Sequence, residues 1–296
     1  TAVKLNGGTL SIQGTATAGQ TTSQTINGLT VSGNCSVVNT SGGTTPNFLS
    51  SSIALGNITR SNLGTVNFTL PAIGNITSTR ANVGGIIGGW ATVGGTDWAA
   101  TTSDGITASN ITALSTYLTT TVAGDTAANY LSTSNVDVTS TQNLSGPVTI
   151  NSLRFNSAAA NTLNLTGTNI VTAGGVLATT NVGANASAVN GGILKGSAGG
   201  DLTVIQNNTS AALTIGSQIA DNTSATALVK SGAGTLVLNS SNTYTGGTTL
   251  NAGILNVSQN DALGTGALTF DNSDTATFGG VPRPDGKVTV NIKGVT

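Results

Sequence analysis

The chain has 296 residues, enough for one large domain or two ordinary ones, and its formal net charge is only −1. Charged residues make up 6% of the chain and form no Lys/Arg cluster, which argues against nucleic acid or an anionic membrane as a partner. No apolar run approaches the roughly 18 to 20 residues of a membrane-spanning helix.

Short runs in which apolar and polar residues alternate recur along the chain, a pattern typical of strands with one buried face. The first clear run is TVNFTL at residues 65–70. Residues 108–120 are the exception, because the spacing of Leu114, Tyr117 and Leu118 suits one or two helical turns. The runs place these residues on the inward side: Val66, Phe68, Leu70, Leu163, Leu165, Leu202, Val204, Leu213, Ile215, Leu236, Leu238, Leu255, Val288, Val290 and Ile292.

A turn-plus-strand phrase also recurs, with neighbouring glycines 17 to 21 residues apart. A drifting period near twenty, with one to three short strands in each period, predicts a solenoid of parallel coils. We expect a regular coil stack over residues 150–296 and a less regular stack with loop excursions over residues 1–149. The phrase is NGGTLSI at Asn6, NGLTVSG at Asn27, AGGVLAT at Ala173, NGGILKG at Asn190 and NAGILNV at Asn251.

The composition fits such a stack of coils. Leu, Ile and Val would fill the narrow interior, and Gly would occupy corners that need a left-handed backbone. Asn side chains at the corners are expected to hydrogen-bond the next Asn in a ladder. Like charges stacked in register would repel, which explains why charged residues are rare.

Residues 232–257, GAGTLVLNSSNTYTGGTTLNAGILNV, are followed by ALGTG at residues 262–266. This stretch resembles the passenger-associated transport repeat, also called the autotransporter-associated β-strand repeat, over about residues 230–270. The resemblance implies a right-handed parallel β-helix that is exported and displayed on the bacterial cell surface, and it brings no catalytic residues. The matching positions are Gly232, Gly234, Leu236, Leu238, Asn242, Tyr244, Gly246, Gly247, Thr248, Gly253 and Leu255.

The residues that could carry chemistry are few. The chain has no His, and all ten acidic residues are Asp, so a carboxylate-based lyase or hydrolase site is disfavoured. Asp271 and Asp274 form the closest acidic group, which an Asx-rich turn explains better than a Ca²⁺ site. One copy of a calcium-repeat-like fragment, SAGGDLTVI at residues 197–205, is weak evidence for a metal. We predict no enzyme activity, cofactor or metal.

The two tryptophans, Trp90 and Trp98, are candidate contacts for a glycan, because an exposed aromatic face can stack on a sugar ring. Large aromatic side chains in so aliphatic a chain more often close a core or a coil end. The sequence therefore leaves both interpretations of this segment open and favours packing.

The function expected from these features is that of a structural cell-surface protein: a rod, a fibre subunit or a stalk. One alternative is an adhesin passenger that binds a glycan or a surface. A polysaccharide-cleaving β-helix enzyme is the second alternative. Neither end of the chain resembles a cap, so we expect end-to-end self-association or continuation of a longer solenoid.

Overall fold

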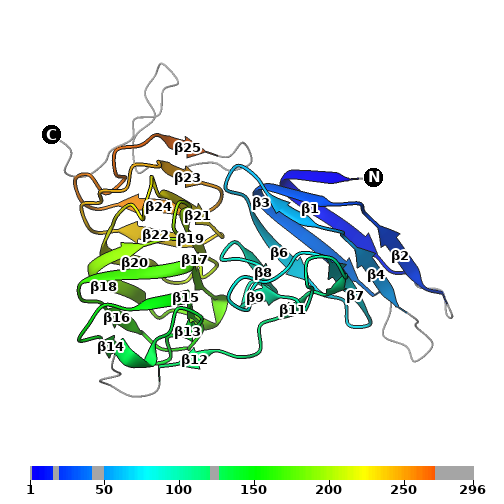
Figure 1. Ribbon diagram of the computed structural model, residues 1–296, viewed down its shortest axis with the longest axis horizontal. Coiled ribbons are helices and arrows are strands. Elements are labelled where there is room, and N and C mark those ends of the chain that lie inside the picture. The colour runs from blue at the N-terminus through cyan, green and yellow to red at the C-terminus, as the bar shows by residue number, and fades with distance from the viewer. Residues whose placement is uncertain (1, 16–19, 42–49, 121–126, 271–296) are drawn as a thin grey trace. The chain divides into compact units, whose positions relative to one another are not determined.

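The computed structural model describes residues 2–15, 20–41, 50–120 and 127–270, and about half of these residues lie in strands (Figure 1). In this part of the chain, the helical segments are two 3₁₀ turns, Ala127–Asn129 and Thr180–Val182. No helix among the described residues is long and apolar enough to cross a bilayer. The all-β prediction is confirmed.

The helical turns expected in residues 108–120 are absent. This segment forms three two-residue strands, β10 (Ser109–Asn110), β11 (Thr112–Ala113) and β12 (Leu118–Thr119). Each strand finds a partner strand, and the segment is rich in Thr and Ser, which are weak helix formers. The helical prediction was therefore wrong because strand pairing outweighed a short apolar spacing.

The chain divides into two compact units, an N-terminal unit (Thr1–Tyr117) and a C-terminal unit (Leu118–Thr296). The sequence predicted that the coil stack becomes more regular after residue 149. The division into two compact units does not test that prediction. Each unit has its own hydrophobic core.

Two sheets form the described part of the N-terminal unit. Parallel pairs stack one coil on the next until β8, where the pairing turns antiparallel in β8–β9, β9–β11 and β7–β10. The antiparallel strands therefore interrupt the parallel stack. The other strands of this unit are β1 (Val3–Gln13), β2 (Thr22–Thr25), β3 (Leu29–Thr40), β4 (Ser51–Ala54), β5 (Ile58–Arg60), β6 (Thr65–Thr69), β7 (Gly74–Ser78), β8 (Ala91–Val93) and β9 (Asp97–Ala100).

The described strands of the C-terminal unit form one sheet of parallel pairs, in which strands lie one above another (Figure 1). Leu228 pairs with Thr248, and Thr248 pairs with Leu268, twenty residues further on. Elsewhere in this sheet the offset ranges from 17 residues (Val136 to Leu153) to 28 residues (Val176 to Val204), so the chain forms coils whose length drifts around and above twenty residues. The strands are β13 (Asn135–Asp137), β14 (Gln142–Asn143), β15 (Thr149–Phe155), β16 (Thr162–Asn164), β17 (Thr168–Ala178), β18 (Ser187–Lys195), β19 (Asp201–Gln206), β20 (Leu213–Ile219), β21 (Ala227–Ser231), β22 (Thr235–Leu238), β23 (Thr248–Leu250), β24 (Ile254–Val257) and β25 (Leu268–Phe270).

The residues expected to point inward do fill the two cores. Leu255 and Leu70 are partly buried and pack against the cores of their units. Val288, Val290 and Ile292 lie outside the described residues. The remaining predicted residues are buried: Val66, Phe68, Leu163, Leu165, Leu202, Val204, Leu213, Ile215, Leu236 and Leu238.

The corners of the coils are built as the composition suggested. In the recurring phrase, Gly191 has a φ of 70°, and a Cβ there would lie 2.6 Å from the carbonyl oxygen of Leu165. A left-handed backbone under a neighbouring coil leaves only Gly at this corner. Asn side chains of neighbouring coils also bond to each other, as expected for one step of an Asn ladder: Asn164 Nδ2 donates to Asn143 Oδ1 at 2.8 Å, one coil away.

Candidate functional site

In the stretch most distinctive in sequence, residues 232–257, the backbones of neighbouring coils lie in close contact. A Cβ at Gly234 would lie 2.1 Å from the carbonyl oxygen of Asn208, and one at Gly253 would lie 2.3 Å from that of Gly232. Real Cβ atoms do not approach a backbone atom so closely, so these glycines are required by contact between coils. We call the following residues of this stretch the stacking motif: Gly232, Gly234, Asn242, Tyr244, Gly246, Gly247, Thr248 and Gly253.

Asn242 of the stacking motif joins three coils through one buried side chain. Its Oδ1 accepts the backbone N–H of Ile219 at 2.7 Å, and its Nδ2 donates to the carbonyl oxygen of Ala262 at 2.6 Å. These partners lie 23 residues before and 20 residues after it. Both ends of the amide are therefore used to hold the coils in register.

A buried lysine lies beside the stacking motif. Lys230 has no exposed surface, and its Nζ donates to the carbonyl oxygens of Ser231, Gly232 and Ala252 at 2.6 to 2.9 Å. Three acceptors satisfy the three N–H donors of an ammonium group, which is what allows the charge to be buried. The sequence analysis did not single out this lysine. The available signal was its position two residues after Leu228, which is buried, because residues two apart on a strand lie on the same face.

A buried ion pair joins neighbouring coils near the start of the C-terminal unit. Asp137 of β13 is the register partner of Arg154 of β15, and Arg154 Nη2 lies 2.6 Å from Asp137 Oδ2. Like charges in register would repel, whereas this pair of opposite charges attracts. The pair was not predicted, because the sequence did not fix which residues of successive coils lie opposite each other.

Asp221 connects its own turn to the following coil. Its Oδ1 accepts the backbone N–H groups of Thr226 and Thr245, and its Oδ2 accepts the hydroxyl of Thr245 at 2.8 Å. Burial acts to raise the pKa of Asp221, but these hydrogen bonds and the charge of Lys195 outweigh it and hold the pKa below its ordinary value. The carboxylate therefore serves to link coils.

Tyr244 is the one phenol of the stacking motif, and its side chain is completely buried. Its hydroxyl lies 2.5 Å from Thr248 Oγ1. Burial raises the pKa of Tyr244 to about 12 from an ordinary value of 10.0, while the hydrogen bond with the Thr248 side chain acts in the opposite direction. The group is thus a packed core residue that resists ionisation.

This pKa predicts an alkaline loss of stability. Because the unfolded chain releases the Tyr244 proton near pH 10 and the folded chain near pH 12, stability is complete below pH 10 and falls as the pH rises towards 12. The expected slope is about 1.4 kcal/mol per pH unit. Urea titrations of the wild type and of Tyr244→Phe at several pH values measure it.

In that comparison, Tyr244→Phe is expected to cost about 1 kcal/mol at neutral pH through the lost hydrogen bond. The difference in the free energy of unfolding between the wild type and Tyr244→Phe should shrink above pH 10, because the variant has no phenol to ionise at position 244. A gap that stays constant up to pH 11.5 would show that Tyr244 is not the group responsible.

The two tryptophans lie at the antiparallel strands that interrupt the stack of the N-terminal unit. Trp98 of β9 has no exposed surface, and Trp90, just before β8, is 6% exposed. Trp98 pairs with Thr92, and its backbone N–H donates to the hydroxyl of Tyr117 at 3.0 Å. An aromatic platform for sugars needs an exposed ring face, so the structure favours the packing interpretation. A glycan contact through either ring stays a prediction.

The acidic residues that might have held a metal do not come together in the described residues. Asp271 and Asp274 lie outside the part of the chain that the structure describes. Asp201, in the calcium-repeat-like fragment, is buried and accepts a hydrogen bond from the hydroxyl of Thr203. Within the described residues, no three His, Cys, Asp or Glu side chains group together as metal ligands.

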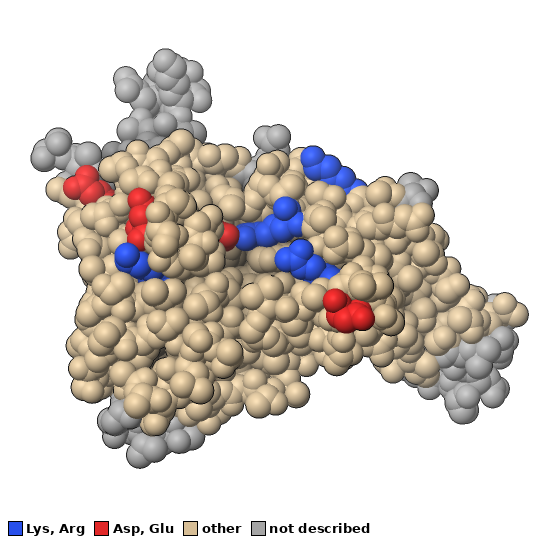
Figure 2. All heavy atoms as spheres, in the orientation of Figure 1, with Lys and Arg blue, Asp and Glu red and all other residues tan. Residues whose placement is uncertain are grey.

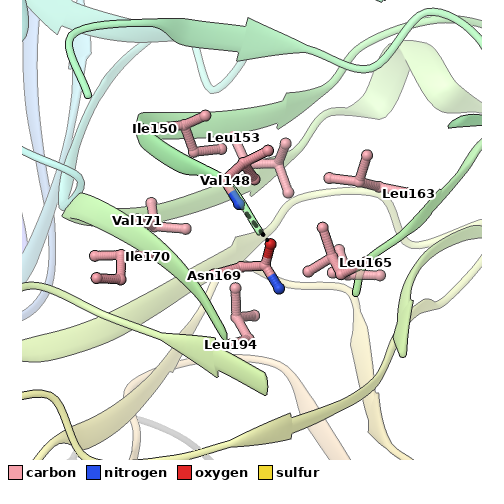
Figure 3. Close-up of a pocket in the computed structure, with 10 residues that line it drawn as sticks. Val148, Ile150, Leu153, Leu163, Leu165, Asn169, Ile170, Val171 and Leu194 are labelled. Carbon is pink, nitrogen blue, oxygen red and sulfur yellow. Dashed lines mark hydrogen bonds between the residues drawn. The ribbon is translucent and has the colours of Figure 1, made fainter. Parts of the chain in front are cut away.

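A void of about 10 Å³ lies inside the C-terminal unit among nine apolar side chains and Asn169 (Figure 3). The Oδ1 of Asn169 accepts the backbone N–H of Val148 at 2.9 Å, so this end of the amide is already engaged. A void of this volume has room for about one water molecule. It is a packing feature of the core, and a substrate cannot enter it.

The stacking motif coincides with a known family pattern. The family model of the passenger-associated transport repeat matches residues 228–257. The chain carries a passenger-associated transport repeat. In structural terms, the glycine spacing of this repeat follows from the close contacts between coils described above.

One relative is similar over a longer stretch. Over 149 residues, the chain is 33% identical to the adhesin BmaC autotransporter of Brucella suis biovar 1 (strain 1330). The match covers 49% of this chain but only 4% of that protein, so the chain spans a small fraction of the relative's length. No solved structure matches the chain.

Proposed function

We propose that this chain is part of the surface-exposed passenger of an autotransporter-type adhesin, where it forms a rigid β-helical rod or stalk. The stacking motif is the observation that carries the proposal. Its glycines admit neighbouring backbones, Asn242 joins three coils, and Tyr244 is buried, so this specific stretch of sequence serves coil stacking. The repeat and the similarity to an adhesin autotransporter support display at the bacterial surface.

The finer fold belongs to the same proposal: a right-handed parallel β-helix. Parallel strands in consecutive coils need crossover connections, and such connections are right-handed in nearly all proteins. Each added coil lengthens a β-helix by about 4.8 Å, with backbone hydrogen bonds along its axis. A stack of this kind makes a stiff spacer.

Binding of a glycan or another surface is the second function that we propose for the parent adhesin. The similarity to a protein named as an adhesin favours this function. An enzymatic role is not proposed, because the described acids serve structural bonds: Asp137 pairs with Arg154, and Asp221 links two coils.

End-to-end association is a further part of this proposal. Among the described residues, β1 pairs along one edge only, with β3. Its inward side chains Val3, Leu5, Leu10 and Ile12 are only partly buried against the core of the N-terminal unit. Another coil that pairs with β1 would bury them, so this edge suits addition of a coil from a second copy or from a longer solenoid.

Two measurements test the proposed function. Protease treatment of intact cells that make the parent protein should release peptides of this chain while a cytoplasmic marker stays intact. Light scattering of the purified chain should show growing particles as its concentration rises. Absence of released peptides contradicts surface display, and a monomer at all concentrations contradicts self-association while leaving the stalk intact.

A further inference from the structure

Two arginines of the N-terminal unit lie against one tryptophan. The guanidinium carbon of Arg60 is 5.8 Å from the centre of the Trp90 ring, and that of Arg80 is 5.9 Å from it. Both distances allow cation–π attraction. The concentration of positive charge is notable because the whole chain has only nine Lys and Arg residues. Figure 2 shows how few charged side chains interrupt an otherwise uncharged face.

The ring that holds the two arginines is fixed in place. A Cβ at Gly88 would lie 2.3 Å from Trp90 Nε1, so the backbone of Gly88 runs directly against the edge of the indole. Only 6% of Trp90 is exposed, whereas both arginines are partly exposed. Trp90 is therefore a support for the guanidinium groups, and those groups are the part of the cluster that solvent reaches.

Arg60 is further fixed by a turn with an unusual backbone. Its Nε donates to the carbonyl oxygen of Gly64 at 2.7 Å, and its Nη2 donates to that of Leu63 at 3.3 Å. Asn62 and Leu63 have φ values of 47° and 58°, a conformation that is rare for a branched residue such as Leu. Backbone strain of this kind is found more often at functional sites than elsewhere.

Arg80 is held more loosely. Its Nη1 donates to the carbonyl oxygen of Ile58 at 3.4 Å, which is long for a hydrogen bond. No acidic side chain among the described residues forms an ion pair with Arg80. The planar fork of its guanidinium can therefore present parallel N–H donors to an incoming group.

We propose that Arg80, held against Trp90 beside Arg60, binds an anionic group carried on a polysaccharide. The chemistry that fits is a planar carboxylate or a sulfate ester, because each accepts two N–H donors from one guanidinium. A guanidinium held against an indole ring gives a charged contact that a neutral glycan cannot exploit. This inference rests on the proposed surface role, and it specifies the class of ligand that the adhesin contacts.

Binding to the purified chain tests this site. The probes are polygalacturonate, which carries carboxylates, dextran sulfate, which carries sulfate esters, and dextran, which carries neither. Biolayer interferometry at low and at physiological salt should show binding to one or both polyanions and none to dextran. The polyanion that binds more tightly identifies the carboxylate or the sulfate as the preferred group.

Three variants separate a specific site from general charge attraction. Arg80→Gln should weaken binding at least about tenfold, and Arg80→Lys should weaken it severalfold, because Lys keeps the charge but lacks the fork. Lys4→Gln removes the same charge from an exposed position in β1 and should change affinity less than about twofold. Thermal unfolding checks that each variant is folded.

The proposal is overturned if neither polyanion binds, if Lys4→Gln weakens binding as much as Arg80→Gln, or if Arg80→Lys binds like the wild type. Because the measurement uses the purified chain, it does not depend on display. Binding without surface exposure would refute the proposed function alone, and exposure without binding would refute this inference alone.

Discussion

Leu236→Asp is expected to lower the free energy of unfolding of the C-terminal unit by several kcal/mol. Leu236 has no exposed surface and is the register partner of Leu213 and Leu255 in the neighbouring coils. A carboxylate at this position would lie in the narrow interior of the stack among aliphatic side chains. Urea titration followed by circular dichroism gives the change.

The matched control is Thr235→Asp, one residue earlier on the same strand. Thr235 alternates with Leu236 and is partly exposed, so its substitution should cost less than about 1 kcal/mol. Both variants add one negative charge to the chain, so a difference between them reports burial alone. Equal losses would show that the inward and outward faces of β22 are assigned wrongly.

The features of the fold that sequence predicts are those determined by neighbours along the chain. Alternation with a period of two identified the inward face, as Leu213 and Ile215 of β20 show, since both are completely buried. The recurring glycine phrase likewise identified corners, because a left-handed backbone is a local property. Gly174 and Gly191, with φ values of 71° and 70°, are examples.

The features that sequence could not predict depend on partners in other coils. Lys230 is buried because carbonyl oxygens that include Ala252, 22 residues later, surround its ammonium group. The pairing of Asp137 with Arg154 likewise depends on how β13 lies beside β15. Coil lengths drift, so the register between such residues does not follow from spacing. Only the folded chain shows which polar groups meet.

The site residues illustrate the same distinction. Composition singled out Trp90 and Trp98 but could not decide between a sugar platform and packing, because both uses need the same side chains. The burial of both rings favours packing, and the arginines that lie on Trp90 were not anticipated. These cations come from β5 and from the segment after β7, which the sequence does not place together.

Gly253→Ala, which adds a single methyl group, provides the sharpest test of the stacking motif. Gly253 has a φ of 77°, and an added Cβ would lie 2.3 Å from Gly232 O and 2.7 Å from Gly234 O. Gly253→Ala is therefore expected to cost about 3 kcal/mol or more, because overpacking against backbone adds to the left-handed conformation. Urea titration of the purified variant measures it.

The control for Gly253→Ala is Gly199→Ala in the same unit. Gly199 has a φ of 64°, but a Cβ there would meet only Ser224 Oγ, at an ordinary distance of 3.5 Å. Its cost should be that of the left-handed backbone alone, about 1 to 2 kcal/mol. The excess at Gly253 then measures the contact between coils. If Gly253→Ala and Gly199→Ala lower the free energy of unfolding by the same amount, the repeat needs Gly253 for its turn only. The close approach of the coils then does not explain the motif.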